Sequence, residues 1–316
     1  MHVSEIHRQL SAAGLRCRVL NTNRIRSALG FALVLLRYAW LGWTPHLHTN
    51  GHNSRSWLLA LGCGLAGRSR GGCLLTLHSG MLPAYLGAVS ARRRGLARLT
   101  CLLYTRVICV SPGIRNAVVS LGVPSERTEI VPAGLKTERP QVALAPLLQN
   151  WIARHWPLLS TALFFRPEYG FDLLVAALDR LRHSYPSLGC VVMGSGEQRA
   201  EAESRVRELG LEENILMVGD VAHDICLKLI SISHVFLRPT LEDGDSISVR
   251  EALSLGVPVV ASRVGMRPDG VMLFPAGDVD AMVARIELAM AAGTGAAAPA
   301  AGCMDRLLGL YRKVAA

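Results

Sequence analysis

The sequence is poor in aromatic residues and contains no closely spaced cysteine pair. Phe, Trp and Tyr make up 5% of the 316 residues, whereas 50% of the residues are hydrophobic. A chain of this length and composition can bury two sizeable cores, which favours an α/β protein and excludes an intrinsically disordered one. The 8 cysteines form no Cys-x-x-Cys motif, and most lie in apolar runs. We therefore expect buried thiols in a reducing compartment, and neither a zinc site nor a disulfide framework.

The sequence also lacks an apolar run long enough to cross a membrane. Its most apolar stretch, residues 28–36, ends at Arg37 and has about half the length that a membrane-spanning helix requires. The N-terminal residues include Glu5, Arg8 and two histidines, which is not typical of a signal peptide. We predict a core helix at residues 28–36 and a cytoplasmic protein.

Acidic residues are scarce in the first half of the chain. Residues 1–150 contain 18 Lys and Arg against 4 Asp and Glu, whereas the remaining residues contain 16 against 20. An exposed basic face in the first half would attract anionic lipid or a pyrophosphate-bearing acceptor, and could hold the protein at the inner membrane face. The densest basic cluster consists of Arg92, Arg93, Arg94 and Arg98. The alternatives are basic residues spread over a solvated surface, and nucleic acid, for which no recognised motif is present.

Residues 234–262 combine two apolar strands, a polar loop and a helix. The runs 234–237 and 259–262 are typical of buried parallel strands, and Ser246 or Ser248 can cap the helix between them. Ligands bind at the carboxyl ends of such strands, and helix N-termini favour anions. The carboxylates of Asp243 and Glu251 could accept hydrogen bonds from a sugar or ribose diol. The alternative is a solvated acidic loop followed by an exposed helical Glu.

This stretch resembles a known family. Asp243-Gly244, Glu251-Ala252 and the run Gly-Val-Pro-Val-Val-Ala-Ser at 256–262 resemble, at this spacing, the donor-site signature of the family 4 retaining glycosyltransferases, which have the GT-B fold. In that signature an acidic residue and a Glu, with seven residues between them, contact the sugar nucleotide; Asp243 stands where Glu is commoner. Three further segments, Thr76–His78, Val131–Gly134 and Gly194–Gly196, also resemble the family, and they follow one another along the chain in the family's order.

The resemblance implies two Rossmann-like α/β domains that face each other across a cleft. Residues 1–140 would form the acceptor-side domain, residues 141–300 the nucleotide-sugar-binding domain, and residues 301–316 a helix that packs back onto the first domain. In the family, a first strand and a Gly-Gly loop precede the elements that we predict here as a helix at 3–14 and a strand at 16–20. That first strand is apparently missing, which suggests a misassigned start or a truncated copy.

The implied reaction is transfer of a sugar from a nucleotide sugar to a hydroxyl of a lipid-linked or polysaccharide acceptor, with retention of configuration and without a metal ion or further cofactor. By the resemblance, His78 lies near the anomeric centre, Asp243 and the amides of residues 244–247 hold the donor hexose, and Glu251 holds a diol. Arg166 would neutralise the departing diphosphate. The donor-binding residues implied are Arg166, Gly194, Gly196, Val218, Gly244, Asp245, Ser246 and Ile247.

Two departures from the family pattern favour an alternative function. Tyr169 occupies the position of a Lys that holds the donor diphosphate, and the usual Arg position falls near Phe164. Together with the missing strand, these residues are compatible with a catalytically impaired homologue that binds a sugar nucleotide or a partner in polysaccharide assembly. For the glycines at 194 and 196, tight backbone packing is an alternative to phosphate binding.

Two further classes of site fit the sequence less well. A nicotinamide oxidoreductase would need a third Gly after Gly194-Ser195-Gly196, where the chain has Arg199. His46, His48 and His52 have spacings that a metal site can use, but no acidic residue is near them in the sequence and local hydrogen bonds are the alternative. Asp243-Gly244-Asp245 could also suggest a metal, but Glu251 follows at the family spacing.

Overall fold

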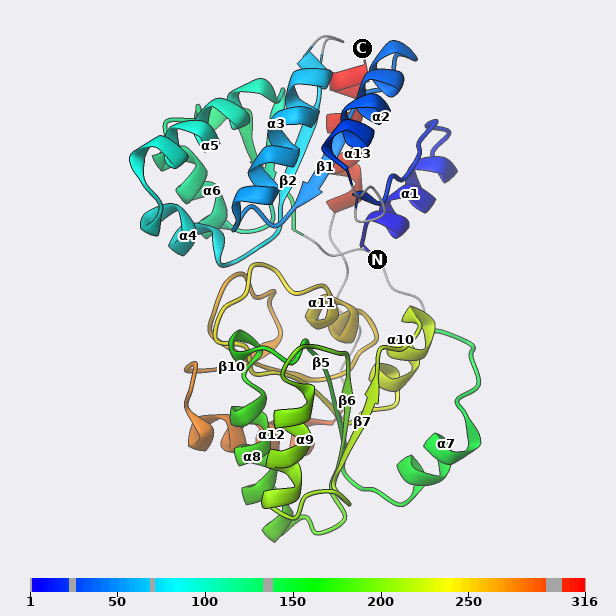
Figure 1. Ribbon diagram of the computed structural model, residues 1–316. Helices are drawn as coiled ribbons and strands as arrows, with labels where there is room; N and C mark the ends of the chain where they lie inside the picture. The colour runs from blue at the N-terminus through cyan, green and yellow to red at the C-terminus, as the bar shows by residue number, and fades with distance from the viewer. Residues whose placement is uncertain (1, 23–26, 69–71, 133–138, 294–302, 316) are drawn as a thin grey trace. The chain divides into compact units, whose positions relative to one another are not determined.

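The computed structural model describes residues 2–22, 27–68, 72–132, 139–293 and 303–315. The chain forms two compact units, each built on a parallel sheet (Figure 1). The first unit comprises residues 1–133, 243–245 and 301–316, and the second comprises residues 134–242 and 246–300. Two parallel α/β units are what the sequence predicted.

The first unit contains a sheet with the strand order β1-β2-β3-β4. Its strands are β1 (His46–Thr49), β2 (Leu74–Leu77), β3 (Arg106–Cys109) and β4 (Thr128–Ile130). Its helices are α1 (His2–Ala12), α2 (Ala28–Trp40), α3 (Ser54–Arg68), α4 (Leu82–Ala88), α5 (Ala91–Leu103), α6 (Pro112–Ser120) and α13 (Cys303–Ala315). All four residues of β2 are buried, as expected for a strand that has neighbours on both sides and is covered on both faces.

Two expectations for the first unit are wrong. Residues 16–20, expected as a strand, have no regular structure, and Val19 and Leu20 are 46% and 44% exposed. They form no hydrogen-bond ladder with β1, which is the strand at that edge of the sheet. Without such a ladder, the backbone N–H and C=O groups of an extended segment have to bond to water instead. The helix expected at residues 28–36 forms as part of α2, but it is not a core helix, since Leu33 and Leu36 are 59% and 64% exposed.

The second unit contains a sheet with the order β10-β9-β8-β5-β6-β7. Its strands are β5 (Leu158–Ala162), β6 (Gly189–Met193), β7 (Ile215–Gly219), β8 (Val235–Arg238), β9 (Val259–Ser262) and β10 (Val271–Phe274). Its helices are α7 (Pro146–Ala153), α8 (Phe171–Ser184), α9 (Arg199–Glu208), α10 (His223–Ser231), α11 (Ile247–Ser254) and α12 (Val279–Ala292). Chain order runs in opposite directions from β5 and from β8, so the topological switch point lies between these two strands.

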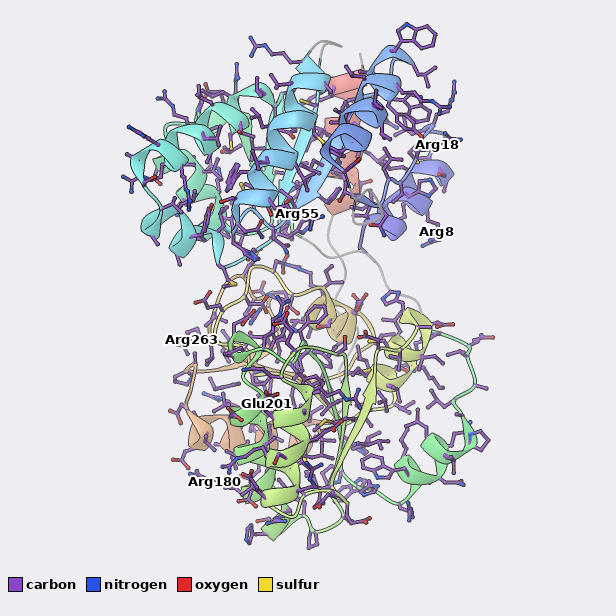
Figure 2. All side chains as sticks on the ribbon, viewed as in Figure 1. Arg8, Arg18, Arg55, Arg180, Glu201 and Arg263 are labelled. Carbon is purple, nitrogen blue, oxygen red and sulfur yellow. The ribbon has the colours of Figure 1, made fainter. Side chains whose placement is uncertain are left out.

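The two units differ in surface charge. Arg8, Arg18 and Arg55 of the first unit are exposed (Figure 2), and no Asp or Glu occurs between Glu5 and Glu126 in the sequence. The second unit exposes both signs, for example Arg180 on α8 and Glu201 on α9. The basic surplus predicted for the first half of the chain is therefore concentrated in one unit.

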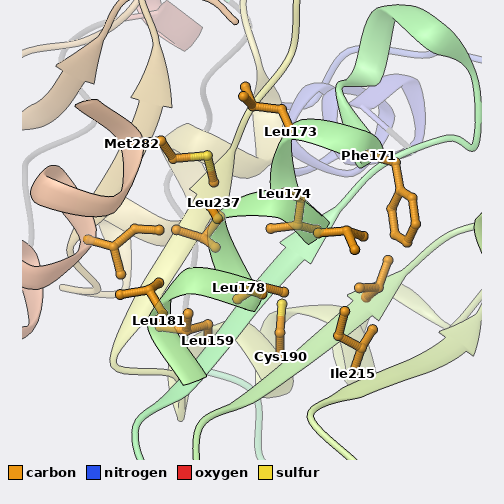
Figure 3. Close-up of a cluster of buried hydrophobic side chains, with 14 of the residues drawn as sticks. Leu159, Phe171, Leu173, Leu174, Leu178, Leu181, Cys190, Ile215, Leu237 and Met282 are labelled. Atoms are coloured by element: carbon orange, nitrogen blue, oxygen red, sulfur yellow. The ribbon is translucent and has the colours of Figure 1, made fainter. Parts of the chain in front are cut away.

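The core of the second unit covers both faces of its sheet. Cys190 and Val192 of β6 pack into one cluster with Leu174 and Leu178 of α8 (Figure 3). Val191 and Met193 alternate with them and belong to the cluster on the opposite face. Because successive side chains of a strand point to opposite faces, an uninterrupted apolar run is what a sheet buried on both faces requires.

The cysteines are free thiols wherever the structure describes them. Five of the seven described cysteines are buried, and none forms a disulfide. Burial raises the pKa of the Cys63, Cys109 and Cys190 thiols to about 12, so these groups stay protonated at neutral pH. The prediction of buried thiols is confirmed for these residues. In the same ranges, no helix is both long and apolar enough to span a membrane.

Candidate functional site

Glu251 is buried near the start of α11, at the carboxyl end of β8. The hydroxyl of Ser246 accepts a hydrogen bond from the Val249 amide and so caps the helix, as the sequence predicted. Glu251 follows on the second turn and is 9% exposed. The alternative reading of an exposed helical Glu is therefore wrong. A carboxylate with this little solvent contact needs fixed hydrogen-bond donors.

One such donor is His223, which the sequence analysis missed. Its Nε2 lies 2.6 Å from Oε1 of Glu251, and because a carboxylate only accepts, the imidazole donates this bond. His223 is the first residue of α10, the helix that follows β7 in the chain. The carboxyl ends of β7 and β8 lie at the same edge of the sheet. A polar residue shortly after β7 was therefore the sequence feature from which His223 could have been predicted as a site residue. Glu251 also affects Cys226: burial, and secondly the nearby Glu251 carboxylate, raise the pKa of the Cys226 thiol to about 12.

The loop before α11 contains the other predicted acidic residues. Oδ1 of Asp243 accepts a hydrogen bond of 3.0 Å from the Gly244 amide, and Asp245 is 8% exposed. Residues 243–245 group with the first unit, whereas Ser246, Ile247 and Glu251 belong to the second. Ile247 is the first residue of α11, so its amide is one of the N-terminal amides without a partner in the helical ladder.

Gly194 and Gly196 allow two backbone segments to approach closely. A Cβ added to Gly194, whose φ is +126°, would lie 1.9 Å from the Leu163 carbonyl oxygen. A Cβ on Gly196 would lie 2.5 Å from the Phe165 amide nitrogen. Backbone packing therefore accounts for both glycines, which is the alternative that the sequence left open. Val218 lies in β7, and its side chain packs against the core cluster of that face.

The close packing of residues 163–165 against residues 194–196 also brings Arg166 next to Glu197. Nη2 of Arg166 is 3.5 Å from Oε1 of Glu197, and the two side chains are 51% and 85% exposed. Ion pairs with this exposure contribute little to stability and exchange partners readily. Arg166 is thus a cation near the carboxyl end of β5, and an anionic ligand can replace Glu197 as its partner.

A second cation at this end of the sheet was not singled out from the sequence. Arg238 is the last residue of β8 and is 8% exposed. Its Nη1 donates to the Ala162 carbonyl at the end of β5, at 2.7 Å, and its guanidinium lies 5.0 Å from the ring centre of Tyr169. Arg238 therefore places a positive charge over the residue that stands at the family's Lys position. The sequence feature that could have predicted Arg238 as a site residue is a charged residue at the end of an apolar run.

The predicted catalytic His78 lies in the first unit, directly after β2. It is partly buried, and its Nε2 lies 3.0 Å from Nδ1 of His48. His52 bonds through Nδ1 to the Ser79 hydroxyl at 2.8 Å, which is the local hydrogen bonding that the sequence offered as an alternative to metal binding. Among the residues that the structure describes, no three or more His, Cys, Asp or Glu side chains are grouped to hold a metal ion.

Two protein families match the chain at the level of sequence. Glycosyltransferase Family 4 matches residues 20–139, and Glycosyl transferases group 1 matches residues 162–296. The boundary between the two matches lies near the boundary between the two compact units.

Curated relatives share about a quarter of the residues over part of their length. The gpi3 subunit of phosphatidylinositol N-acetylglucosaminyltransferase from Schizosaccharomyces pombe is 27% identical over 55% of this chain and 37% of the relative. A GDP-mannose-dependent alpha-(1-6)-phosphatidylinositol monomannoside mannosyltransferase from Mycolicibacterium smegmatis is 26% identical over 57% of this chain and 51% of the relative. The matched region spans between a third and about half the length of these relatives.

Solved structures share the fold across nearly the whole chain. HepE from Anabaena, in complex with UDP-glucose, has a TM-score of 0.67 at 17% identity and covers 98% of this chain and 87% of its own. A sucrose-phosphate synthase from Thermosynechococcus elongatus has a TM-score of 0.67 at 21% identity, over 94% of this chain and 80% of its own. The chain therefore belongs to the family 4, group 1 glycosyltransferases and has their GT-B fold, as the sequence predicted.

Proposed function

We propose that the protein is a glycosyltransferase that moves a sugar from a nucleotide-sugar donor to a hydroxyl of a lipid-linked or polysaccharide acceptor, with retention of configuration. The observation that carries this proposal is the buried carboxylate of Glu251, held by His223 at the carboxyl end of β8. Its support is the family membership, the names of the relatives that act on phosphatidylinositol lipids, and the likeness to a structure that contains UDP-glucose.

The second unit would bind the donor. Glu251 would accept hydrogen bonds from a diol of the nucleotide sugar, and the amides of Ile247 and Ser248, which have no partner in the helical ladder, would face its anionic or hydroxyl oxygens. Asp243, with the amides of residues 244–247, would hold the transferred hexose. The reaction then needs no cofactor besides the sugar nucleotide.

The chemical step separates a diphosphate from the anomeric carbon. Negative charge develops on the leaving oxygen, so a cation placed there in advance lowers the barrier. We assign this role to Arg166, and Arg238 adds positive charge at the neighbouring strand end. His78 would interact with the departing or incoming oxygen near the anomeric centre, where an imidazole can donate or accept a proton.

Turnover and binding assays together test the proposal. The protein is incubated with UDP- and GDP-sugars and with lipid or oligosaccharide acceptors, and the anomeric configuration of the product is determined by NMR. Transfer with retention is the expected result. Binding of a nucleotide sugar without transfer to any acceptor would instead favour the impaired homologue, for which Tyr169 at the Lys position is the specific observation. Absence of binding to every nucleotide sugar contradicts both functions.

Removing the Arg166 side chain tests the diphosphate contact. Arg166→Ala should raise the donor KM about 10- to 150-fold, because one charge-assisted hydrogen bond contributes about 1.5–3 kcal/mol. The unfolding temperature should change little, since the Arg166–Glu197 pair is solvent-exposed. Steady-state kinetics with varied donor concentration measures the effect. The matched control is Glu197→Ala. It removes the carboxylate that competes with the donor diphosphate for the Arg166 guanidinium, so the donor KM should stay the same or fall. An unchanged donor KM in Arg166→Ala would argue against a contact between Arg166 and the diphosphate.

We also propose that the first unit binds an anionic membrane surface. Arg92, Arg93, Arg94 and Arg98 are all exposed on α5, and α2 of the same unit exposes Leu33, Leu36 and Trp40 by 59%, 64% and 78%. Basic residues attract anionic headgroups, and exposed apolar residues can enter the interface. A lipid-linked acceptor would be reached most readily by an enzyme held at such a surface.

Vesicle binding tests the basic helix. The triple substitution of Arg92, Arg93 and Arg94 by Ala should weaken co-sedimentation with phosphatidylserine-containing vesicles about 100-fold, since each basic residue contributes about 1 kcal/mol near an anionic surface. The control triple replaces three exposed arginines of the second unit: Arg180, which Figure 2 labels, Arg205 and Arg207. Equal losses in the two triples would mean that charge number alone matters and would refute a specific surface on α5.

A further inference from the structure

The histidines around His78 share one face of the first sheet. β1 and β2 are parallel, with His48 opposite Thr76 and Leu47 opposite Leu75. Because side chains alternate along a strand, His46 and His48 lie on the same face as Thr76, whereas Leu47 and Leu75 lie on the other face. The same alternation, continued past the end of β2, puts His78 on the histidine face. The sequence spacing thus predisposes these side chains to meet.

The rings form a continuous row of contacts. His48 and His78 stack with ring centres 5.3 Å apart and planes at 23°, and Nδ1 of His48 lies 3.0 Å from Nε2 of His78. The centre of the His46 ring lies 4.1 Å from that of His48. His46 is itself fixed through both nitrogens: Nε2 bonds to the Thr76 hydroxyl at 2.7 Å, and Nδ1 to the hydroxyl of Tyr311.

A hydrogen bond between two imidazole nitrogens constrains protonation. One nitrogen must carry the proton and the other must accept it, so the two rings cannot both be protonated at these atoms while the bond is made. If His48 donates, a neutral His78 carries its own proton on Nδ1; if His78 donates, its Nδ1 is an acceptor. In either case the bond selects one tautomer of His78, and the tautomer decides what its other nitrogen can do.

We infer that His48 is a positioning residue that holds the ring and the tautomer of His78 for glycosyl transfer, with His46 as its support. This inference rests on the proposed role of His78 in that reaction. The support reaches the last helix, because Tyr311 belongs to α13, which lies alongside β1 (Figure 1). Burial raises the pKa of the Tyr311 phenol, so the hydroxyl keeps its proton and can donate it to His46.

Two variants of His48 separate the hydrogen bond from packing. His48→Phe keeps an aromatic ring for stacking but cannot form the bond, and its kcat should fall about 10- to 100-fold with little change in the donor KM, because orienting a general acid or base supports catalysis rather than binding. His48→Ala removes the ring beside a cavity of about 350 Å³ that His46 and His48 line. Added imidazole can enter this space and should restore part of the kcat of His48→Ala.

The controls address folding and specificity. His183 on α8 is exposed and bonds to the Asp179 carbonyl, so His183→Ala should keep the wild-type kcat and should not respond to imidazole. Unfolding temperatures of all variants are compared with that of the wild type. Wild-type kcat in His48→Phe, or equal activity of His48→Ala with and without imidazole, would overturn the inference.

A spectroscopic measurement distinguishes failure of this inference from failure of the proposed function. If the wild-type protein transfers no sugar, the proposed function fails, but the histidine pair can still be observed by ¹⁵N NMR of labelled imidazoles. The expected result is a single tautomer of His78 in the wild type and a mixture of tautomers in His48→Phe. Identical His78 nitrogen shifts in the two proteins would overturn the positioning role whatever the activity.

Discussion

Replacing Glu251 with Ala should lower kcat/KM for glycosyl transfer about 10²- to 10⁴-fold. The buried carboxylate is proposed to accept two hydrogen bonds from a donor diol, and each such charge-assisted bond contributes about 1.5–3 kcal/mol. Glu251→Gln keeps the side-chain shape and an oxygen that can accept the His223 bond. It should therefore fold normally and lose less activity than the Ala variant. Initial rates at subsaturating donor measure both effects.

The control for Glu251 is a carboxylate without a proposed role. Glu208, exposed on α9, should tolerate replacement by Ala without loss of kcat/KM. His223→Asn provides a second comparison, because it weakens the hold on Glu251 but leaves the carboxylate in place; we expect an intermediate loss. If Glu251→Ala remains folded and turns over like the wild type, the assignment of the donor site is wrong.

Replacing Gly194 with Ala should destabilise the second unit by about 3 kcal/mol or more. The added Cβ would stand 1.9 Å from the Leu163 carbonyl oxygen, at a φ of +126° that other residues rarely adopt. Backbone strain of this kind costs about 1–3 kcal/mol, and the forced separation of two packed segments adds a similar amount. Urea unfolding followed by circular dichroism should show a lower midpoint for the transition of this unit.

A glycine without close neighbours provides the comparison. Gly87 in α4 has no atom within 4 Å of an added Cβ and no positive φ, so Gly87→Ala should be neutral or slightly stabilising, as Ala is in helices. Similar unfolding midpoints for Gly194→Ala and the wild type would show that the 163–165 segment can move away. The glycine would then be free to serve the donor site rather than the packing.

The sequence predicted the second unit more closely than the first. β9 has the limits expected for residues 259–262, and Ser246 caps α11 as expected, because each element there is an apolar run bounded by Gly, Pro or a capping residue. Residues 16–20 have a similar local pattern but no neighbouring strand to bond with. Local pattern predicts a strand only where the rest of the sheet supplies its partner.

The hydrogen-bond partners of the candidate site residues could not be predicted from the sequence. His48 meets His78 because β1 lies beside β2, and His223 meets Glu251 because α10 lies beside α11, although β7 and β8 are not neighbours in the sheet. Arg238 and Tyr169 likewise meet only because β8 lies beside β5. A sequence pattern shows which face of a strand a residue occupies, whereas the order of strands in the sheet decides which residue stands next to it.

The membership of α13 in the first unit has a consequence for synthesis on the ribosome. Residues 134–242 and 246–300, which form the second unit, are translated before α13, and Tyr311 of α13 forms a hydrogen bond with His46 of the first unit. Domains generally fold as units while the chain emerges. The second unit can thus reach its final state first, while the first unit, most of which is translated earlier, is completed only after α13 has left the exit tunnel.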